Sequence, residues 1–88
     1  MFTAIFTNQF KKDYKLAKRR YLRMEDLDRV LEKLISGKVL EHKYKDHALI
    51  GKFRDCRECH IDGDWLLIYR YEIGNSLKLN MKRSNLVY

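Results

Sequence analysis

The chain has 88 residues and a mass of 10.7 kDa, the size of one small domain, which excludes an active-site cleft between two domains. Lys and Arg number 19 against 12 Asp and Glu, a net charge of +7, which favours a polyanionic partner such as RNA, DNA or an acidic protein. No run of about 20 apolar residues and no signal-peptide pattern is present, so we expect a cytoplasmic protein without a membrane partner.

The N-terminal part carries most of the positive charge. Residues 2–6 alternate and are rich in aromatic and β-branched types, which predicts a first strand, and Asn8 is expected to cap a helix. Apolar residues then recur at helical spacing, namely Phe10, Tyr14, Ala17 and Tyr21. The other faces of this helix carry basic residues that we expect to bind RNA: Lys11, Lys12, Lys15, Lys18 and Arg19.

The rest of the chain predicts one more helix and three strands. The pattern of residues 24–35 is helical, and Gly37 stands where a helix ends. Residues 39–50 are polar and predict an ordered loop or a short extended piece. Tight turns at Asp62-Gly63 and Gly74-Asn75 separate strands near 53–61, 65–71 and 77–81. The order β-α-α-β-β-β predicts an α+β fold, with two N-terminal helices packed on an antiparallel sheet in a single domain over 1–88.

One local motif, Cys56-Arg57-Glu58-Cys59-His60, fits the C-x-x-C-H pattern of c-type haem attachment. His60 would be one axial ligand of the iron and Met81 the other. Residues three apart on a strand point to opposite faces, so the two thiols would diverge. Haem therefore remains a remote alternative, four convergent zinc ligands are not expected either, and we expect no metal or cofactor.

Histidine and carboxylate side chains provide the groups for RNA cleavage without metal. His47 lies in the polar loop, and His60 lies at a strand end near Asp64. Cleavage requires a base for the 2′-hydroxyl proton, an acid for the departing 5′-oxygen and a cation for the phosphate. Aromatic rings at Phe53, Trp65 and Tyr88 are candidates for base stacking, although core packing is the more ordinary explanation for Phe53 and Trp65.

Several segments together resemble the YafQ branch of the RelE-type bacterial toxins. These segments are Phe10-Lys11-Lys12-Asp13, Tyr44-Lys45-Asp46-His47-Ala48-Leu49-Ile50-Gly51 followed by Phe53, Arg57-Glu58-Cys59-His60-Ile61, and Asp64-Trp65-Leu66-Leu67-Ile68-Tyr69. The resemblance implies a RelE-like fold and a ribosome-dependent mRNA endonuclease that a small DinJ-like antitoxin neutralises.

The same resemblance implies roles for individual residues. His47 and His60 match histidines with acid/base or phosphate-stabilising work, and Asp64 matches a catalytic carboxylate. Trp65 matches the neighbouring aromatic residue. The basic face of the first helix, with Lys52 and Arg54, would hold ribosomal RNA.

The C-terminal tail departs from the family pattern. Ungapped counting from Trp65 puts Met81 at the family's Arg and Asn85 at its tail His, whereas a small shift lets Arg83 replace that Arg and stabilise the charge on the phosphate. Tyr88 could stand for the family's terminal aromatic residue. Because Asn cannot exchange a proton at neutral pH, a catalytically weak or silent RNA- or antitoxin-binding protein is the alternative function.

Overall fold

The computed structural model describes residues 1–20, 24–62 and 65–83. Within these described ranges, two helices, two short 3₁₀ helices (η) and five strands follow one another. They are β1 (Thr3–Phe6), α1 (Asn8–Arg19), α2 (Met24–Ile35), η1 (His42–Tyr44), β2 (His47–Ala48), η2 (Gly51–Phe53), β3 (Arg57–Asp62), β4 (Trp65–Glu72) and β5 (Ser76–Arg83). In the described part of the chain, no helix has the length and apolar character needed to cross a membrane.

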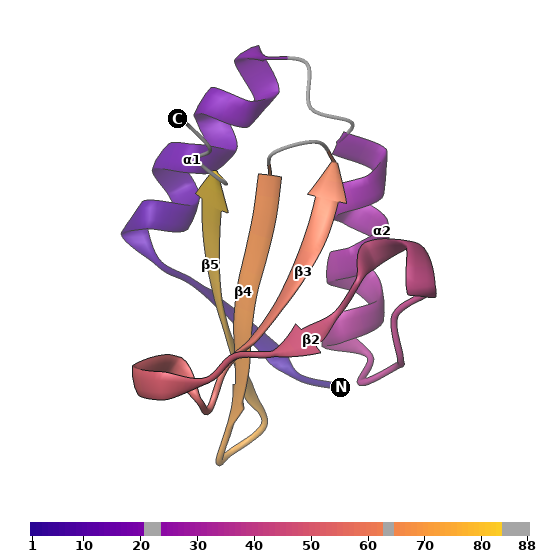
Figure 1. Ribbon diagram of the computed structural model, residues 1–88, viewed down its shortest axis with the longest axis vertical. Helices are drawn as coiled ribbons and strands as arrows, with labels where there is room; N and C mark the ends of the chain where they lie inside the picture. The colour runs from indigo at the N-terminus through magenta and orange to yellow at the C-terminus, as the bar shows by residue number, and fades with distance from the viewer. Residues whose placement is uncertain (21–23, 63–64, 84–88) are drawn as a thin grey trace.

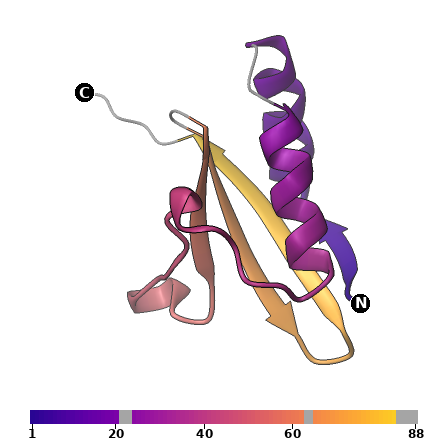
Figure 2. The same ribbon diagram turned by 90° about the vertical axis from the view of Figure 1, so that its right-hand side faces the viewer.

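The strands form one sheet in the order β1-β5-β4-β3-β2 (Figure 1). Figure 2 shows both helices on one side of this sheet and η2 on the other. The predicted α+β fold is confirmed, with two refinements: β2 adds an edge strand, and β1 runs parallel to β5 while the other pairs are antiparallel. A parallel neighbour is possible for β1 because helices, and not a tight hairpin, connect it to the remaining strands.

Helix α1 is capped by Thr7, one residue before the predicted Asn8. The Thr7 hydroxyl oxygen accepts a hydrogen bond from the backbone N–H of Phe10 at 3.0 Å. The same hydroxyl donates to the Asn80 side-chain oxygen at 2.9 Å, so the cap also ties the start of α1 to β5. Asn8 is already inside the helix, where its side chain is not the cap.

Glycine sets two of the chain's changes of direction. Gly37 ends α2 with a φ of +72°, and the Lys38 N–H closes back onto the Lys33 carbonyl at 2.8 Å, as predicted for a helix C-terminus. Gly74 and Asn75 both have positive φ, 89° and 62°, a conformation that Gly and Asn adopt most readily, and they lie in the short loop between the paired residues Glu72 and Ser76. The predicted turn between β4 and β5 is therefore confirmed.

The core lies between the helices and the covered face of the sheet. Alternate residues of the central strands point into it, and α2 contributes Leu27, Val30 and Leu34. The strand residues that are completely buried there are Cys59, Leu67, Leu77, Leu79 and Met81. Burying a side chain of this size stabilises the fold by about 1.5–3 kcal/mol, so this layer supplies most of the stability.

The strand predicted near 53–61 begins only at Arg57. Gly51 has a φ of +73°, and the chain turns there into η2 before it enters β3. The antiparallel pairing of β3 with β4 confirms the predicted hairpin. Its turn residues, Gly63 and Asp64, lie outside the described residues, as does Tyr21 of the predicted helix face.

Candidate functional site

The face of the sheet opposite the helices, here called the open face, carries the candidate site. Because Cys59 and Ile61 point into the core, strand alternation places Glu58 and His60 on the open face. The pairing register extends each of them into a row across three strands. One row is His60, Leu66 and Lys82, and the next is Glu58, Ile68 and Asn80.

His47, Glu58 and His60 meet at one edge of the open face. His47 on β2 pairs directly with Glu58 on β3, and His47 Nε2 lies 3.2 Å from Glu58 Oε1. The His47 and His60 rings have centroids 6.1 Å apart. One ligand atom from each of the three residues lies within 4.8 Å of the other two. The predicted pair His47 and His60 is thus brought together, and the structure adds Glu58.

A hydrogen-bonded network fixes the loop that carries His47. The Asp46 carboxylate accepts hydrogen bonds from the Tyr69 hydroxyl at 2.7 Å and from Arg57 Nε at 3.1 Å. Lys45 adopts a left-handed conformation with a φ of 50°, and its carbonyl lies 2.8 Å from His47 Nδ1. Burial, followed by the bond to Asp46, raises the pKa of Tyr69, so this hydroxyl remains a hydrogen-bond donor. These contacts hold Asp46, the residue directly before His47, in place.

A basic cleft of about 390 Å³ opens on the same face. It is lined from η2 by Lys52 and Phe53, and from the strands by residues that include Arg70, Lys78 and Asn80. Phe53 is 52% exposed, and Lys52 Nζ lies 5.7 Å from the centre of its ring. Cations beside an exposed aromatic ring suit the phosphates and bases of single-stranded RNA.

Sequence reasoning missed four of the residues on this face. Arg70, Lys78 and Lys82 are ordinary charged residues of the strands outside any conspicuous motif, and Glu58 lies within the C-x-x-C-H motif, whose pattern specifies only the cysteines and the histidine. The alternation of buried Leu77, Leu79 and Met81 was visible in the sequence and implied that the residues between them face the other way. The register, which places Lys82 in the cross-strand row of His60 and pairs Arg70 with Lys78, was not visible.

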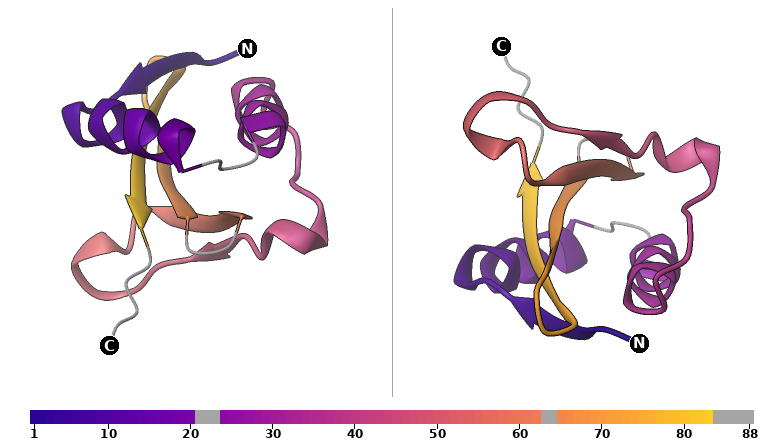
Figure 3. Two further views of the ribbon diagram at one scale, coloured as in Figure 1. Left: turned by 90° about the horizontal axis from the view of Figure 1, so that it is seen from above. Right: turned by 90° about the horizontal axis from the view of Figure 1, so that it is seen from below.

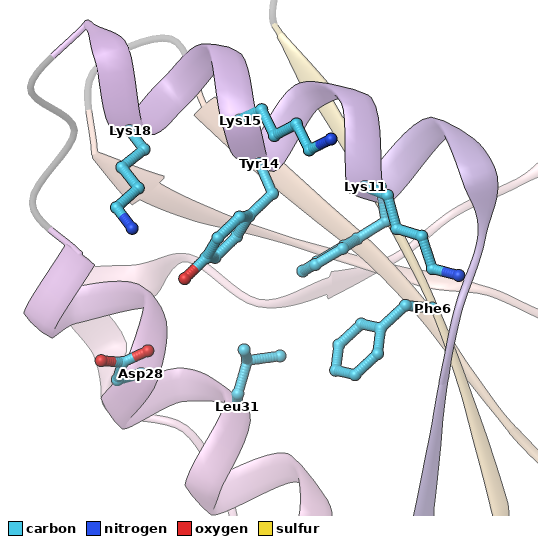
Figure 4. Close-up of a pocket in the computed structure, with 8 residues that line it drawn as sticks. Phe6, Lys11, Tyr14, Lys15, Lys18, Asp28 and Leu31 are labelled. Atoms are coloured by element: carbon cyan, nitrogen blue, oxygen red, sulfur yellow. The ribbon is translucent and has the colours of Figure 1, made fainter.

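The basic residues of α1 lie away from this site. Lys11, Lys15 and Lys18 line a groove of about 630 Å³ between α1, α2 and the end of β1. Figure 4 shows these lysines around an apolar floor, with Tyr14 of α1 and Leu31 of α2 pointing toward one another. Figure 3 shows that both helices lie on the side of the sheet away from η2. The groove and the basic cleft are therefore separate surfaces.

Helical spacing divides the five predicted RNA-binding residues of α1 into two sets. Lys11, Lys15 and Lys18 share the groove, whereas Lys12 and Arg19 are exposed on another part of the helix surface. A single-stranded RNA bound in the basic cleft would have to pass around the β-sheet to reach the groove. RNA binding by these five residues remains a prediction.

Trp65 does not offer a ring for stacking. It is 6% exposed and belongs to the core cluster with Leu67 and Tyr69, so core packing explains this tryptophan. Phe53 has the exposed ring instead.

The remaining predicted residues lie outside the basic cleft or outside the described structure. Arg54 is exposed directly after η2. The backbone of Arg83 pairs with Trp65 at the end of β5, and its side chain is not described. Asp64, Asn85 and Tyr88 lie outside the described residues.

The C-x-x-C-H motif is not arranged for haem attachment. Cys59 is completely buried on the core side of β3, while His60 is on the open face. Burial is also the main reason that the pKa of the Cys59 thiol rises from 9.0 to about 12. Both cysteines are free, and Cys59 serves as a small core side chain.

Comparison with known proteins identifies the family. The family model for the bacterial toxin of type II toxin-antitoxin system, YafQ, matches residues 2–84. The mRNA interferase toxin YafQ of Escherichia coli strain K12 is 38% identical over 66 residues, which are 74% of this chain and 72% of that protein.

Solved structures share the fold over nearly the whole chain. A copper-bound mutant toxin from Helicobacter pylori has a TM-score of 0.87 and 28% identity, and the match covers 94% of each chain. A chain of the Escherichia coli DinJ–YafQ complex has a TM-score of 0.81 and 30% identity, over 94% of this chain and 93% of that one. With a family model that spans almost all of its sequence, the chain belongs to the YafQ family of bacterial toxins of type II toxin–antitoxin systems.

Proposed function

We propose that this YafQ-family toxin is an endoribonuclease that cuts mRNA on the ribosome and so inhibits translation. The observation that carries the proposal is that His47, Glu58 and His60 meet on the open face of the sheet, the face on which the basic cleft also opens. The name of the Escherichia coli relative, an mRNA interferase, supports the same activity. An imidazole pair beside cationic side chains is the inventory that phosphodiester cleavage by acid and base requires.

The proposed reaction is attack of the RNA 2′-hydroxyl on the adjacent phosphate. One imidazole takes the 2′-hydroxyl proton, and the other gives a proton to the departing 5′-oxygen, leaving a 2′,3′-cyclic phosphate and a 5′-hydroxyl end. Rings with centroids 6.1 Å apart leave room for a phosphate to reach both. Each such proton transfer typically contributes about 10²–10⁴-fold to the rate. Asp64 is proposed to assist as a third acid/base group.

A cation must hold the negative charge that develops on the phosphate, and two side chains are candidates. The resemblance assigns this work to Arg83. The register supports Lys82, because Lys82 lies in the same cross-strand row as His60. Comparison of Lys82→Ala with Arg83→Ala in the cleavage assay separates them, and the larger loss of rate identifies the phosphate-binding side chain.

Recognition of the message is proposed to use η2 and the basic cleft. Phe53 offers its exposed ring to one base, while Lys52, with Arg54 nearby, contacts phosphates. Lys12 and Arg19, on the outer part of α1, are proposed to contact ribosomal RNA. Tyr88 remains a proposed stacking residue, as the resemblance implies.

The partner that neutralises the toxin is proposed to be a DinJ-like antitoxin, because a DinJ–YafQ complex is among the solved relatives. The groove between α1 and α2 suits it. An apolar floor edged by Lys11, Lys15 and Lys18 fits an amphipathic helix with acidic residues beside its apolar face. Antitoxin bound there leaves the open face structurally intact.

The test is cleavage of a defined message on programmed ribosomes. His60→Ala should reduce the cleavage rate by about 10²–10⁴-fold. His42→Ala is the matched control, because His42 is an exposed histidine in η1 outside the cluster, and it should cleave like the parent. Equal cleavage by the parent and His60→Ala would remove His60 from the mechanism.

The tail provides the reason for a second candidate, a toxin-fold protein that binds antitoxin or ribosome with weak cleavage or none. Asn85 stands near the place of the family's tail histidine. On this alternative, the parent chain binds ribosomes without cutting message, and Asn85→His creates activity. Strong cleavage by the parent, unchanged in Asn85→His, would exclude it.

The proposed cleavage does not use a metal ion, although one solved relative is a copper-bound toxin. In this chain, His47, Glu58 and His60 supply two imidazoles and a carboxylate from one face, a donor set that fits such an ion. A transition-metal ion acts as a Lewis acid when bound. The proton transfers assigned above belong to the free imidazoles.

A further inference from the structure

We propose that His47, Glu58 and His60 bind one divalent transition-metal ion, Zn²⁺ or Cu²⁺, and that the bound ion inhibits RNA cleavage. The inhibitory part rests on the proposed function, because it assumes that the two imidazoles transfer protons. The binding part rests on geometry alone. Metal binding and proton transfer would then compete for the same imidazole nitrogens.

The three side chains are already near the arrangement of a metal site. Ligand atoms bound about 2.1 Å from one metal ion at tetrahedral angles lie about 3.4 Å apart. His47 Nε2 and Glu58 Oε1 are 3.2 Å apart, and all three ligand atoms lie within 4.8 Å of one another. The His47 side chain is 47% exposed and is at the sheet edge, so a small rotation completes the set.

The hydrogen bond on the far side of the His47 ring directs the ring toward a cation. A backbone carbonyl only accepts hydrogen bonds, so Nδ1 carries the hydrogen in its 2.8 Å contact with Lys45. In the neutral ring, Nε2 therefore presents a lone pair to the Glu58 carboxylate, which is also an acceptor. A cation between Nε2 and Oε1 satisfies both. Metal-binding histidines usually have such a carbonyl partner on the other nitrogen.

The backbone holds the three ligands in place. Glu58 and His60 are two residues apart on β3 and so share a face, and His47 is the direct cross-strand partner of Glu58. Asp46, bonded to Tyr69 and Arg57, anchors the loop before His47. The Glu58 side chain is only 13% exposed. The ligands therefore lose little conformational freedom when an ion binds.

The donor set selects the class of ion. Imidazole nitrogens suit Zn²⁺, Cu²⁺ and Ni²⁺, whereas Mg²⁺ and Ca²⁺ prefer an all-oxygen shell. Cys59 is not a fourth ligand, because it is buried on the opposite face of β3. An imidazole whose lone pair is bound to a metal ion cannot accept a proton from a 2′-hydroxyl. Bound Zn²⁺ or Cu²⁺ is therefore an inhibitor.

The binding test is calorimetric titration of the purified full chain with ZnCl₂ and with CuSO₄. We expect one ion per chain, nitrogen hyperfine coupling in the Cu²⁺ electron paramagnetic resonance spectrum, and a higher Tm with metal. Glu58→Gln should weaken binding at least tenfold, and His47→Ala more. His42→Ala is the matched control and should bind like the parent.

Circular dichroism of each metal-free variant establishes that the chain is folded before its affinity is compared. Absence of stoichiometric binding by the parent would overturn the site. A loss of affinity in His42→Ala equal to that in His47→Ala would overturn the assignment of its ligands.

The inhibition test compares cleavage in EDTA with cleavage in one equivalent of Zn²⁺. We expect activity in EDTA, loss of activity with Zn²⁺, and recovery when EDTA is added again. Cleavage that increases with Zn²⁺ would overturn the inhibitory role while leaving the binding site. If the parent binds Zn²⁺ but does not cleave in EDTA, the proposed nuclease function fails and the metal site stands.

Discussion

The two faces of the sheet differ in what they contribute: one packs the core, and the other carries the candidate site. The covered face is apolar, packed against α1 and α2, and its central side chains are completely buried. The open face alternates with it residue by residue, and it carries His47, Glu58, His60 and the basic cleft. Neighbouring residues on one strand therefore have opposite tasks, as Cys59 and His60 show. Substitutions on the two faces should affect different measurements.

The largest expected effect on stability comes from the covered face. Leu79 is completely buried in the core, so Leu79→Ala should lower the free energy of unfolding by about 2–5 kcal/mol, because methyl groups are lost and a cavity remains. Urea denaturation followed by circular dichroism measures this. Lys78→Ala, one residue earlier and exposed, is the control and should change stability by no more than about 0.5 kcal/mol. Similar losses in both variants would contradict the division of the faces.

The Asp46 network connects the two faces and should affect both stability and activity. Asp46→Ala leaves the partly buried Tyr69 hydroxyl and the Arg57 side chain without their carboxylate, so stability should fall by about 1–3 kcal/mol. Cleavage should also fall through a lower kcat, because His47 is no longer held. Asp55→Ala removes an exposed carboxylate nearby and should do neither. Recovery of kcat in Asp46→Glu would support positioning.

Phe53 tests the open face without disturbing the core. Its ring is 52% exposed, so Phe53→Ala should leave the Tm nearly unchanged. If the ring stacks on a base, the substitution should weaken RNA binding by about 1–3 kcal/mol. Fluorescence anisotropy with a short single-stranded RNA measures the Kd. Phe53→Trp should retain the affinity of the parent, and a Kd unaffected by Phe53→Ala would show that the ring does not contact RNA.

Charge reversal in the groove should affect the antitoxin and not the chemistry. Lys15 lines the groove on the helix side of the sheet. Lys15→Glu should slow association with an acidic antitoxin helix by about tenfold at low salt, as measured by surface plasmon resonance. If Lys15 serves only the antitoxin, cleavage by the same variant should match the parent, whereas reduced cleavage on ribosomes would support the predicted contact of Lys15 with RNA. Lys38→Glu, in a lysine outside the groove, is the control for the change in net charge.

Ionisation of the Cys59 thiol should have the smallest effect on stability at neutral pH, and it should lower stability in alkali. Burial, its largest cause, raises the pKa of this thiol from 9.0 to about 12. A thiol with a raised pKa contributes its full stability below pH 9.0, and this contribution is lost as the pH rises toward 12. Iodoacetamide at pH 8.5 should label Cys56 in the folded protein and Cys59 only after unfolding, as mass spectrometry would show. Equal labelling of both would contradict the buried position.

The covered face was largely predictable from the sequence, because its signals are local. Helical spacing in residues 24–35, the stop at Gly37 and the Gly74-Asn75 turn each specify structure within a few residues. The first cap was misplaced by one residue, because Thr7 and Asn8 are both good caps and only the pairing with β5 favours Thr7. The parallel pairing of β1 with β5 joins distant segments and has no local signal.

The candidate site was predicted only in part, because its residues come together through strand register and not through local signals. His47 and His60 were selected by residue chemistry and by family resemblance. Glu58, Lys78 and Lys82 were missed because a charged residue on a strand is ordinary until the register shows what lies beside it. For Trp65, the sequence left both stacking and core packing open, since a large aromatic ring next to a predicted catalytic residue is equally suited to a core. Burial alone separates these two possibilities.

The pairing of β1 with β5 has a consequence for how the toxin is made. β5 lies between β1 and β4, and the Thr7 cap of α1 is bonded to Asn80, so the strand at one side of the sheet needs residues more than 70 positions later in the chain. During synthesis, β1 and α1 leave the ribosome long before their partner strand. Long-range pairing of this kind forms late in folding. The nascent chain therefore completes its sheet only after β5 has emerged.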